Sequence, residues 1–336
     1  MQYNIRYDLR NPPQWRIPFD EYYARFLDQV AWADEHGFAR VILSEHHFVE
    51  DGYVPSIFPV AAAIAARTSR IRINLSLILL PLKHPIQVAE DAAIVDIISG
   101  GRLELTVGGG YRRNEFEGYG IPREERASRM EEGTEIIRRC WEEEEFSFQG
   151  RHWQLKNVRM TPKPVQKPRL PLIMGGNSAA AARRAARLTD AFSPAQPRWM
   201  ADYRSELEKL GKDPGPPLPE NAPTSPLFLH VARDPDAAWQ RIAPHALYEM
   251  NEYGKYTVDD PNLPYEPVSG SDALRSAAAY SILTPDEAVA FGKRLQEAMG
   301  PAAGLGFHPL MGGMPLELGQ ESLDLVVSEV MPRLRN

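Results

Sequence analysis

Short apolar segments alternate along the chain with longer segments in which apolar residues recur at the spacing of a helix. Phe19, Tyr22, Phe26 and Val30, for example, share one helical face. The short segments predict strands at residues 3–7, 40–43, 71–80, 103–107, 170–174, 191–193, 227–231 and 304–308. Because strands that alternate with helices form parallel βα units, this pattern predicts an α/β fold, a (β/α)8 TIM barrel with insertions.

Three stretches interrupt the alternation. Residues 143–160 carry aromatic side chains on both sides of a Gln-Gly pair, which indicates a β-hairpin. Residues 211–226 are rich in proline and predict an irregular surface connection. Residues 251–283 form a long irregular stretch of the kind that often serves as a lid. Since one barrel takes roughly 250 residues, we interpret residues 1–336 as a single barrel domain with these insertions.

Composition and charge narrow the class of protein. The 336 residues are 43% hydrophobic, and the formal net charge of −7 argues against a broad nucleic-acid-binding surface. The N-terminus has no long apolar segment, so we expect neither a signal peptide nor a membrane span. The single cysteine, Cys140, cannot form an internal disulfide, which fits a reducing cytosol. We therefore expect a cytoplasmic protein without a broad nucleic-acid-binding surface.

The predicted strand at residues 40–43 ends in a group of titratable residues. Its apolar run leads directly into Glu45, His46 and His47. In a parallel barrel the C-terminal ends of the strands carry the active site. Successive strand residues point to opposite faces, so the two imidazoles cannot both face that site. A His-His pair alone is more often a turn or a surface feature, but the barrel context favours one catalytic and one supporting histidine.

Two glycine clusters stand at other predicted strand ends. They are Gly108, Gly109 and Gly110 after the fourth strand, and Gly175, Gly176, Asn177 and Ser178 after Met174 at the end of the fifth. Exposed N–H groups before a helix favour an anion such as a phosphate, and the alternative is a tight turn in which Ser178 or Asn177 caps the helix. The first cluster could likewise let a flat ring or a phosphate approach the backbone.

Other polar residues near strand ends are candidates for contact with a substrate or for support of the site. They are Glu45, His84, Tyr111 and His308. The first strand lacks the His-x-His pattern of many metal-dependent barrels, so we expect no metal site. The chain also lacks a Gly-x-Ser-x-Gly elbow and a Walker or dinucleotide-binding glycine loop.

Four segments resemble those of a known family. They are Leu-Ser-Glu-His-His-Phe at 43–48, Leu-Leu-Pro-Leu-Lys-His-Pro at 79–85, Ser-Gly-Gly-Arg-Leu-Glu-Leu at 99–105 with Asn-Glu-Phe at 114–116, and Pro-Leu-Ile-Met-Gly-Gly-Asn-Ser at 171–178. The four segments occur in this order along the chain, between predicted strands and helices that alternate in the same way. By these features the chain resembles the bacterial luciferase-like monooxygenases, which are flavin-using barrels. The resemblance covers residues 1–193 well and the rest loosely.

The resemblance implies a reduced flavin bound noncovalently at the strand ends. It implies reduced FMN supplied by a separate flavin reductase, O2 as the second reactant, and a small organic substrate. It maps a catalytic histidine onto His46, which leaves His47 as a structural partner. It also maps an unusual cis peptide behind the flavin ring onto Ser76-Leu77. We expect the flavin or its phosphate to lie against both glycine clusters, and we expect a homodimer.

The sequence also departs from the luciferase pattern. Gly109 replaces a phosphate-binding arginine, and Gly176 and Asn177 replace an acidic residue and a serine, so the phosphate would rest mainly on backbone N–H groups. These changes leave two cofactors open, FMN and the deazaflavin coenzyme of sister families. With the deazaflavin the reaction would be hydride transfer, and His46 would serve as acid or base. A non-catalytic flavin-binding barrel is a further alternative, against which the titratable residues at the strand ends argue.

Overall fold

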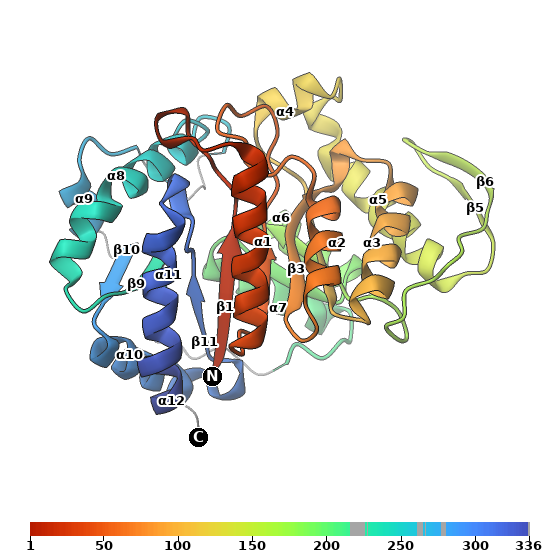
Figure 1. The fold of residues 1–336 in the computed structure, drawn as a ribbon. Coiled ribbons are helices and arrows are strands. Elements are labelled where there is room, and N and C mark those ends of the chain that lie inside the picture. Colours follow the sequence, from red (N-terminus) through yellow and green to blue (C-terminus); the bar gives the residue numbers. More distant parts are fainter. Residues whose placement is uncertain (216–225, 227, 261–264, 266, 277–279, 335–336) are drawn as a thin grey trace.

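The computed structural model describes residues 1–215, 226, 228–260, 265, 267–276 and 280–334, and its elements alternate as Figure 1 shows. The principal strands are β1 (Gln2–Tyr7), β2 (Arg40–Leu43), β3 (Arg72–Leu79), β4 (Leu103–Gly108), β7 (Leu172–Gly176), β8 (Ala191–Pro194), β9 (Phe228–Val231), β10 (Tyr280–Leu283) and β11 (Gly304–Phe307). The helices are α1 (Phe19–Glu35), α2 (Ile57–Arg67), α3 (Pro85–Ser99), α4 (Arg113–Gly118), α5 (Arg126–Glu142), α6 (Ala179–Leu188), α7 (Met200–Lys209), α8 (Pro235–Gly254), α9 (Ser271–Ser276), α10 (Pro285–Met299), α11 (Leu316–Leu325) and α12 (Met331–Leu334).

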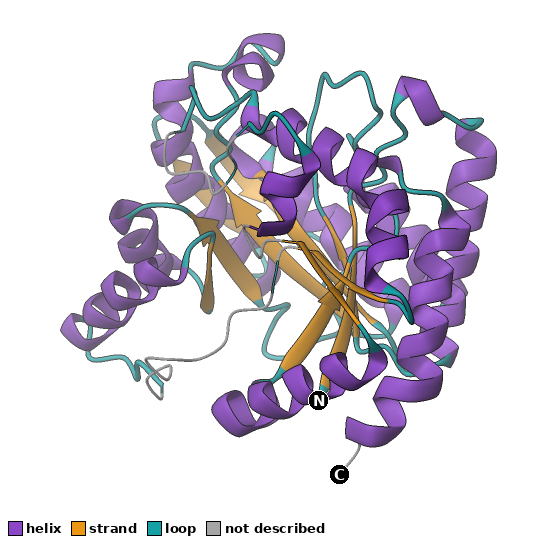
Figure 2. Cartoon of the chain, turned by 90° about the vertical axis from the view of Figure 1, so that its left-hand side faces the viewer, coloured by secondary structure: helices purple, strands orange, loops and turns teal. Residues whose placement is uncertain are grey.

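Seven strands form one curled parallel sheet in the order β11-β1-β2-β3-β4-β7-β8, with helices around its outside (Figure 2). The predicted α/β fold with parallel strands is therefore confirmed, and each of the eight predicted strand segments contains a strand. The closed barrel is not seen among the described residues, because β9 pairs with β10 in a separate parallel sheet. Strand β9 packs beside β11.

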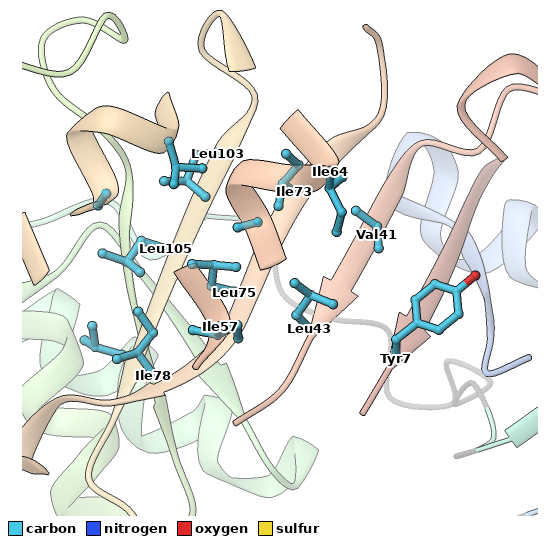
Figure 3. Packing of buried hydrophobic residues seen from close by; sticks show 14 of the residues in the cluster. Tyr7, Val41, Leu43, Ile57, Ile64, Ile73, Leu75, Ile78, Leu103 and Leu105 are labelled. Atoms are coloured by element: carbon cyan, nitrogen blue, oxygen red, sulfur yellow. The ribbon is translucent and has the colours of Figure 1, made fainter. Parts of the chain in front are cut away.

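Each strand of the sheet turns one face towards the helices and the other towards the interior of the curve. The strand register places Ile5, Val41, Ile73 and Leu103 side by side, and all four are fully buried. Figure 3 shows apolar side chains of these strands around Ile64 of α2. Because side chains alternate along a strand, the residues between them point into the curve, where the sheet positions polar groups.

An ion cluster fills the N-terminal part of this inner face. Glu104 on β4 accepts hydrogen bonds from Arg40 Nε at 2.7 Å, Arg72 Nε at 2.6 Å and Asn74 Nδ2 at 2.9 Å. Burial raises the pKa of Glu104, but the hydrogen bonds from Arg40, Asn74 and Arg72 outweigh burial and lower this pKa to about 2. One carboxylate therefore ties three neighbouring strands together beneath the C-terminal ends.

Helix ends follow the signals in the sequence. Thr284 and Glu287 form a reciprocal capping box at the start of α10, and Gly100 ends α3 with a φ of +65°.

Among the described residues, no helix combines the length and the apolar character needed to cross a membrane.

The predicted hairpin is confirmed. Strands β5 (Phe146–Gln149) and β6 (Gln154–Val158) pair antiparallel and extend away from the main sheet (Figure 1). Of the proline-rich stretch 211–226, residues 216–225 lie outside the described residues.

The stretch 251–283 is more regular than the sequence suggested. Helix α8 continues into it as far as Gly254, and it also contains α9 and β10. The hydrophobic pattern did not reveal β10, because the strand comprises only Tyr280–Leu283 and follows a long segment without clear periodicity. Residues 261–264, 266 and 277–279 of this stretch lie outside the described residues.

Replacement of Glu104 tests the ion cluster. Glu104→Gln removes the charge that pairs with Arg40 and Arg72, and we expect it to lower the free energy of unfolding at pH 7 by about 2–3 kcal/mol. Because the pKa of Glu104 is lowered to about 2 in the folded protein, its stabilisation is complete above the unfolded-state pKa of about 4.3 and decreases as the pH falls towards 2.

Urea unfolding followed by circular dichroism at pH 7 and at about pH 3.5 measures this difference. The exposed pair of Glu317 with Arg25 provides the control, since Glu317→Gln should change stability little at either pH. An equal loss of stability at both pH values in Glu104→Gln would show that the charge of Glu104 is not the cause.

Candidate active site

A cavity of about 960 Å³ opens at the C-terminal ends of the sheet strands. Its wall includes Arg6 from β1, Ser76 from β3, Met174 from β7 and Ser193 from β8. Small-molecule sites typically measure about 300–1,000 Å³, so this cavity has room for a cofactor together with a small substrate.

Most residues that the sequence singled out meet at this cavity. Those in its wall are Glu45, His46, Ser76, Leu77, Gly109, Gly110, Tyr111, Met174, Gly175, Gly176, Asn177 and Ser178. Gly108, His84 and His308 are not part of the wall. The structure does not bring His84 into the site, because Pro85 begins α3 and leaves the His84 side chain exposed at the helix start.

Leu77 forms part of the cavity floor between β4 and β7. A Cβ atom at position 108 would lie 2.6 Å from Leu77 Cδ1, and one at position 175 would lie 2.5 Å from Leu77 Cδ2. Gly108 and Gly175 are therefore explained by the packing of Leu77, whereas Gly109 has room above its Cα to approach a ligand. The peptide between Ser76 and Leu77 is cis, as the resemblance implied.

The N-terminal end of α6 borders the cavity and is positively charged. Ser178 caps this helix, since its side chain accepts the N–H of Ala181 at 3.2 Å. Arg184 and Arg126 line the cavity nearby, and Arg184 Nε lies 2.9 Å from Glu131 Oε1. Free N–H groups, the helix dipole and guanidinium groups together provide a site that suits a phosphate. The capping role of Ser178 and an anion site are thus compatible.

His46 lies in the cavity wall between a carboxyl and a phenol. Its Nδ1 is 2.9 Å from Glu115 Oε1, and its Nε2 is 3.5 Å from the Tyr111 hydroxyl. Its ring also meets the ring of Tyr53 edge to face, with centroids 4.9 Å apart. Burial, reinforced by the charge of Arg112, lowers the pKa of His46 well below its ordinary value. The imidazole is therefore neutral near pH 7.

Glu115 on α4 is a functional candidate that the sequence did not single out. The same oxygen that faces His46 also accepts the backbone N–H of His47 at 2.9 Å. Burial raises the pKa of Glu115 to about 7, although the His47 N–H and Arg112 act in the opposite direction. Its side chain pairs with a residue 69 positions away, so no local spacing could have identified the pair.

His47 belongs to a second buried network. Its Nε2 lies 2.7 Å from Glu45 Oε1, and its Nδ1 lies 3.3 Å from the Tyr119 hydroxyl. Lys83 Nζ is 2.9 Å from the same oxygen of Glu45. His47, unlike His46, is not part of the cavity wall, and its role as a structural partner stays a prediction.

The cavity wall also contains residues that the sequence analysis missed. Arg6 donates to the Tyr253 hydroxyl at 3.2 Å, and the hydroxyls of Tyr253 and Tyr53 are 2.9 Å apart. Strand alternation could have placed Arg6 on the inner face, opposite Ile5. Tyr253 and Tyr265 come from the stretch 251–283, so the predicted lid contributes directly to the cavity.

His308 lies in a buried cluster outside the cavity wall. Its Nε2 is 3.6 Å from Asp8 Oδ1 and its Nδ1 is 3.9 Å from Glu249 Oε1. One potential ligand atom from each of these three residues lies within 4.8 Å of the others. The two carboxyls face opposite ring nitrogens, however, and Arg10 Nε is 3.4 Å from Asp8 Oδ2. A cation could use only one ring nitrogen and would meet this guanidinium, so we assign the cluster to charge balance.

Comparison with known proteins gives the family. The model of the family described as luciferase-like monooxygenase matches residues 7–287. Protein y4wF of Sinorhizobium fredii is 34% identical over 164 residues, which are 49% of this chain and 48% of that protein, so the match spans about half of that relative. The F420-dependent glucose-6-phosphate dehydrogenase of Nakamurella multipartita is 27% identical over 330 residues, 93% of each chain.

A solved structure shows the same fold over the whole chain. The oxygenating constituent of 3,6-diketocamphane monooxygenase from Pseudomonas putida, in complex with FMN, superposes with a TM-score of 0.76 at 19% identity, covering 100% of this chain and 99% of that one. Since the family model covers most of the sequence, the chain belongs to the luciferase-like monooxygenases, a family of flavin- or F420-dependent oxidoreductases.

Proposed function

We propose that this protein is a flavin-dependent monooxygenase that uses reduced FMN and O2 to oxidise a small organic substrate. The observation that carries the proposal is His46 in the cavity wall, held by the buried Glu115 behind it, in a cavity that is also bordered by the N-terminal end of α6. We further propose that a separate reductase supplies the reduced FMN, since the FMN-bound relative is itself described as an oxygenating constituent.

The residues present fit this cofactor. The α6 N–H groups and Arg184 would hold its phosphate, while Leu77 and Met174 would offer an apolar surface to its ring. Gly109 leaves the space that close approach to the backbone requires. Reduced FMN, when bound, supplies the electrons that activate O2, and a deazaflavin coenzyme would instead supply a hydride.

Glu115 sets the proton position on His46. An ionised Glu115 accepts the Nδ1–H of His46, which leaves the lone pair of Nε2 free to accept a proton from a substrate. A protonated Glu115 donates to Nδ1, so that Nε2 carries the imidazole proton and can pass it to a substrate as Nδ1 takes the proton of Glu115, which leaves a neutral imidazole and an ionised Glu115. Because the pKa of Glu115 is about 7, His46 can serve as base or acid within the physiological range.

A second candidate function is hydride transfer with a deazaflavin coenzyme. The match to the F420-dependent dehydrogenase of Nakamurella multipartita favours it, because that alignment covers 93% of both chains. In that case the same phosphate site and the same His46–Glu115 pair would serve a different reaction. A non-catalytic flavin-binding barrel fits less well, since His46 in the wall is paired with a buried carboxyl group that ligand binding alone does not require.

Further parts of the proposal concern the whole molecule. We propose a single domain whose strands close into a (β/α)8 barrel and whose 251–283 stretch acts as a lid. We also propose a homodimer, because α3 exposes the apolar side chains of Ile94, Ile97 and Ile98. A cytoplasmic location agrees with the single, unpaired Cys140.

Cofactor affinity tests the proposed chemistry. We expect FMN to bind more tightly than the deazaflavin coenzyme, as measured by fluorescence titration. Arg184→Gln should weaken FMN binding about tenfold but leave riboflavin affinity unchanged, because only FMN carries the phosphate. Arg187 on the same helix lies outside the cavity wall, so Arg187→Gln is the matched control. Tighter binding of the deazaflavin would favour the second candidate function.

Replacement of the two neighbouring histidines separates catalysis from support. His46→Ala should slow the oxidation reaction about 10²–10⁴-fold with little change in flavin affinity, since it removes an acid–base group. His47→Ala should instead lower stability by roughly 0.5–1.5 kcal/mol through a lost buried hydrogen bond. Stopped-flow oxidation of bound reduced flavin by O2, with hydrogen peroxide release as a proxy, measures the reaction. Wild-type chemistry in His46→Ala with loss of chemistry in His47→Ala would reverse the two roles.

The pH profile tests Glu115. A step that needs Nε2 of His46 as a base should accelerate as the pH rises through the Glu115 pKa of about 7, because ionised Glu115 holds the proton on Nδ1. Glu115→Gln should abolish this inflection, whereas Glu117→Gln, at an exposed position of the same helix, should retain it. Single-turnover rates between about pH 5.5 and 8.5 provide the measurement. An unchanged inflection in Glu115→Gln would assign it to another group.

A further inference from the structure

The cavity wall contains a guanidinium group, that of Arg6, which has no carboxylate partner among the described residues. Arg6 lines the cavity and is only partly buried. Its Nη2 atom donates to the Tyr253 hydroxyl at 3.2 Å. Within the part of the chain that the structure describes, no carboxylate oxygen lies within 4.0 Å of this guanidinium. An unpaired positive charge therefore faces the cavity.

Nearby acids do not neutralise this charge. Burial raises the pKa of Glu249, the acid that acts on Arg6, and so opposes its ionisation. Asp259 also lines the cavity, but its carboxylate lies 3.6 Å from Arg113 Nε and accepts the Arg113 backbone N–H at 3.0 Å. The positive charge of Arg6 is consequently left for a ligand.

A second arginine adds to the positive potential beside His46. Arg112 is fully buried, and among the described residues its three guanidinium nitrogens have no hydrogen-bond partner. The group lies over the ring of Tyr256 at 4.0 Å and near that of Tyr111 at 5.7 Å. Burial of an unpaired cation is costly, and aromatic faces offset only part of that cost. An anion bound at Arg6 would add negative charge on the same side of the site.

Aromatic side chains connect Arg6 to His46. The hydroxyls of Tyr253 and Tyr53 are 2.9 Å apart, and the Tyr53 ring centroid is 4.9 Å from that of His46. Tyr265 stacks on Tyr253 with centroids 4.3 Å apart and also lines the cavity. Aromatic rings therefore lie between the Arg6 guanidinium and the His46 imidazole. They offer a surface on which a flat, apolar part of a ligand can pack.

We propose that the substrate is a small aromatic carboxylic acid, whose carboxylate pairs with Arg6 and whose ring lies among these tyrosines with its reactive part towards His46. This assignment rests on the proposed function, since it names the substrate class for the same site. The planar guanidinium of Arg6 matches a carboxylate through two parallel N–H···O bonds. The phosphate-binding groups lie instead at the α6 end, where Arg184 and the helix N–H groups converge.

Binding of a matched pair of probes tests the proposal without any need for turnover. 2-Naphthoate and 2-naphthamide have the same ring and nearly the same size, but only the first carries a charge at neutral pH. Isothermal titration of the full chain, with and without saturating FMN, should show at least about tenfold tighter binding of naphthoate. Arg6→Gln should abolish this preference, Arg6→Lys should retain part of it, and Arg184→Gln should leave it intact.

Each outcome separates the substrate site from the cofactor site. Equal affinities for the two probes in the wild-type protein would overturn the proposal, and so would loss of the preference in Arg184→Gln but not in Arg6→Gln. If Arg6→Gln does not fold, Arg6→Lys decides, because a preference equal to that of the wild type would exclude the bidentate pair. A retained preference for naphthoate in a protein that binds no flavin would refute the proposed function while leaving the carboxylate site standing.

Discussion

The candidate site depends on the position of one side chain, that of Leu77. Strand β3 pairs in step with β4 as far as Ser76, and the register then shifts so that Ile78 lies opposite Val107. Leu75 and Ile78 are both fully buried, although they are three positions apart rather than two. The shift therefore leaves Leu77 beside Ser76 in the cavity wall, although strict alternation would have turned it towards the helices.

The consequences of this shift extend to two other strands. With Leu77 inside the curve, a Cβ atom at position 108 would lie 2.6 Å from its side chain and one at position 175 would lie 2.5 Å from it, so glycine at both positions lets Leu77 keep its place. Strands β4 and β7 therefore lack side chains at these positions near the cavity, which gives a planar ligand access to the backbone. The shape of the site is thus set by packing within the sheet before any contact with a cofactor.

Two buried carboxyl groups stand close together in this site and differ in their surroundings. Glu45 has two close partners, Lys83 and His47. Burial raises the pKa of Glu115 to about 7, although the backbone N–H of His47 and the charge of Arg112 act to lower it. Titratable groups whose environments differ in this way can divide their tasks. In the function that we propose, Glu45 holds His47 in place, while Glu115 exchanges a proton with His46.

Sequence analysis predicted the strands and located Glu45 and His46, because strand ends are local features that hydrophobic runs reveal. It interpreted all the strand-end glycines as ligand-binding, whereas Gly108 and Gly175 make room for a side chain from a third strand. Glu115, Arg6 and Tyr253 escaped notice because each acquires its role only through contacts far along the chain. His84 was expected near the site because it follows a predicted strand. The helix that begins at Pro85 instead leaves its side chain exposed.

Two arginines connect ligand binding to stability. Among the described residues the Arg6 guanidinium has no carboxylate within 4.0 Å and the Arg112 guanidinium has no hydrogen-bond partner, and burial of such charges lowers the stability of the fold. A ligand with a carboxylate binds only the folded state, so it removes part of this cost and raises the unfolding temperature in proportion to its affinity. A neutral analogue of the same shape gains the aromatic contacts but leaves the charges unpaired. If the substrate is the carboxylic acid that we propose, selectivity arises from the charge of Arg6 in the cavity wall, and the same charge that lowers the stability of the empty site favours the charged ligand over its neutral analogue.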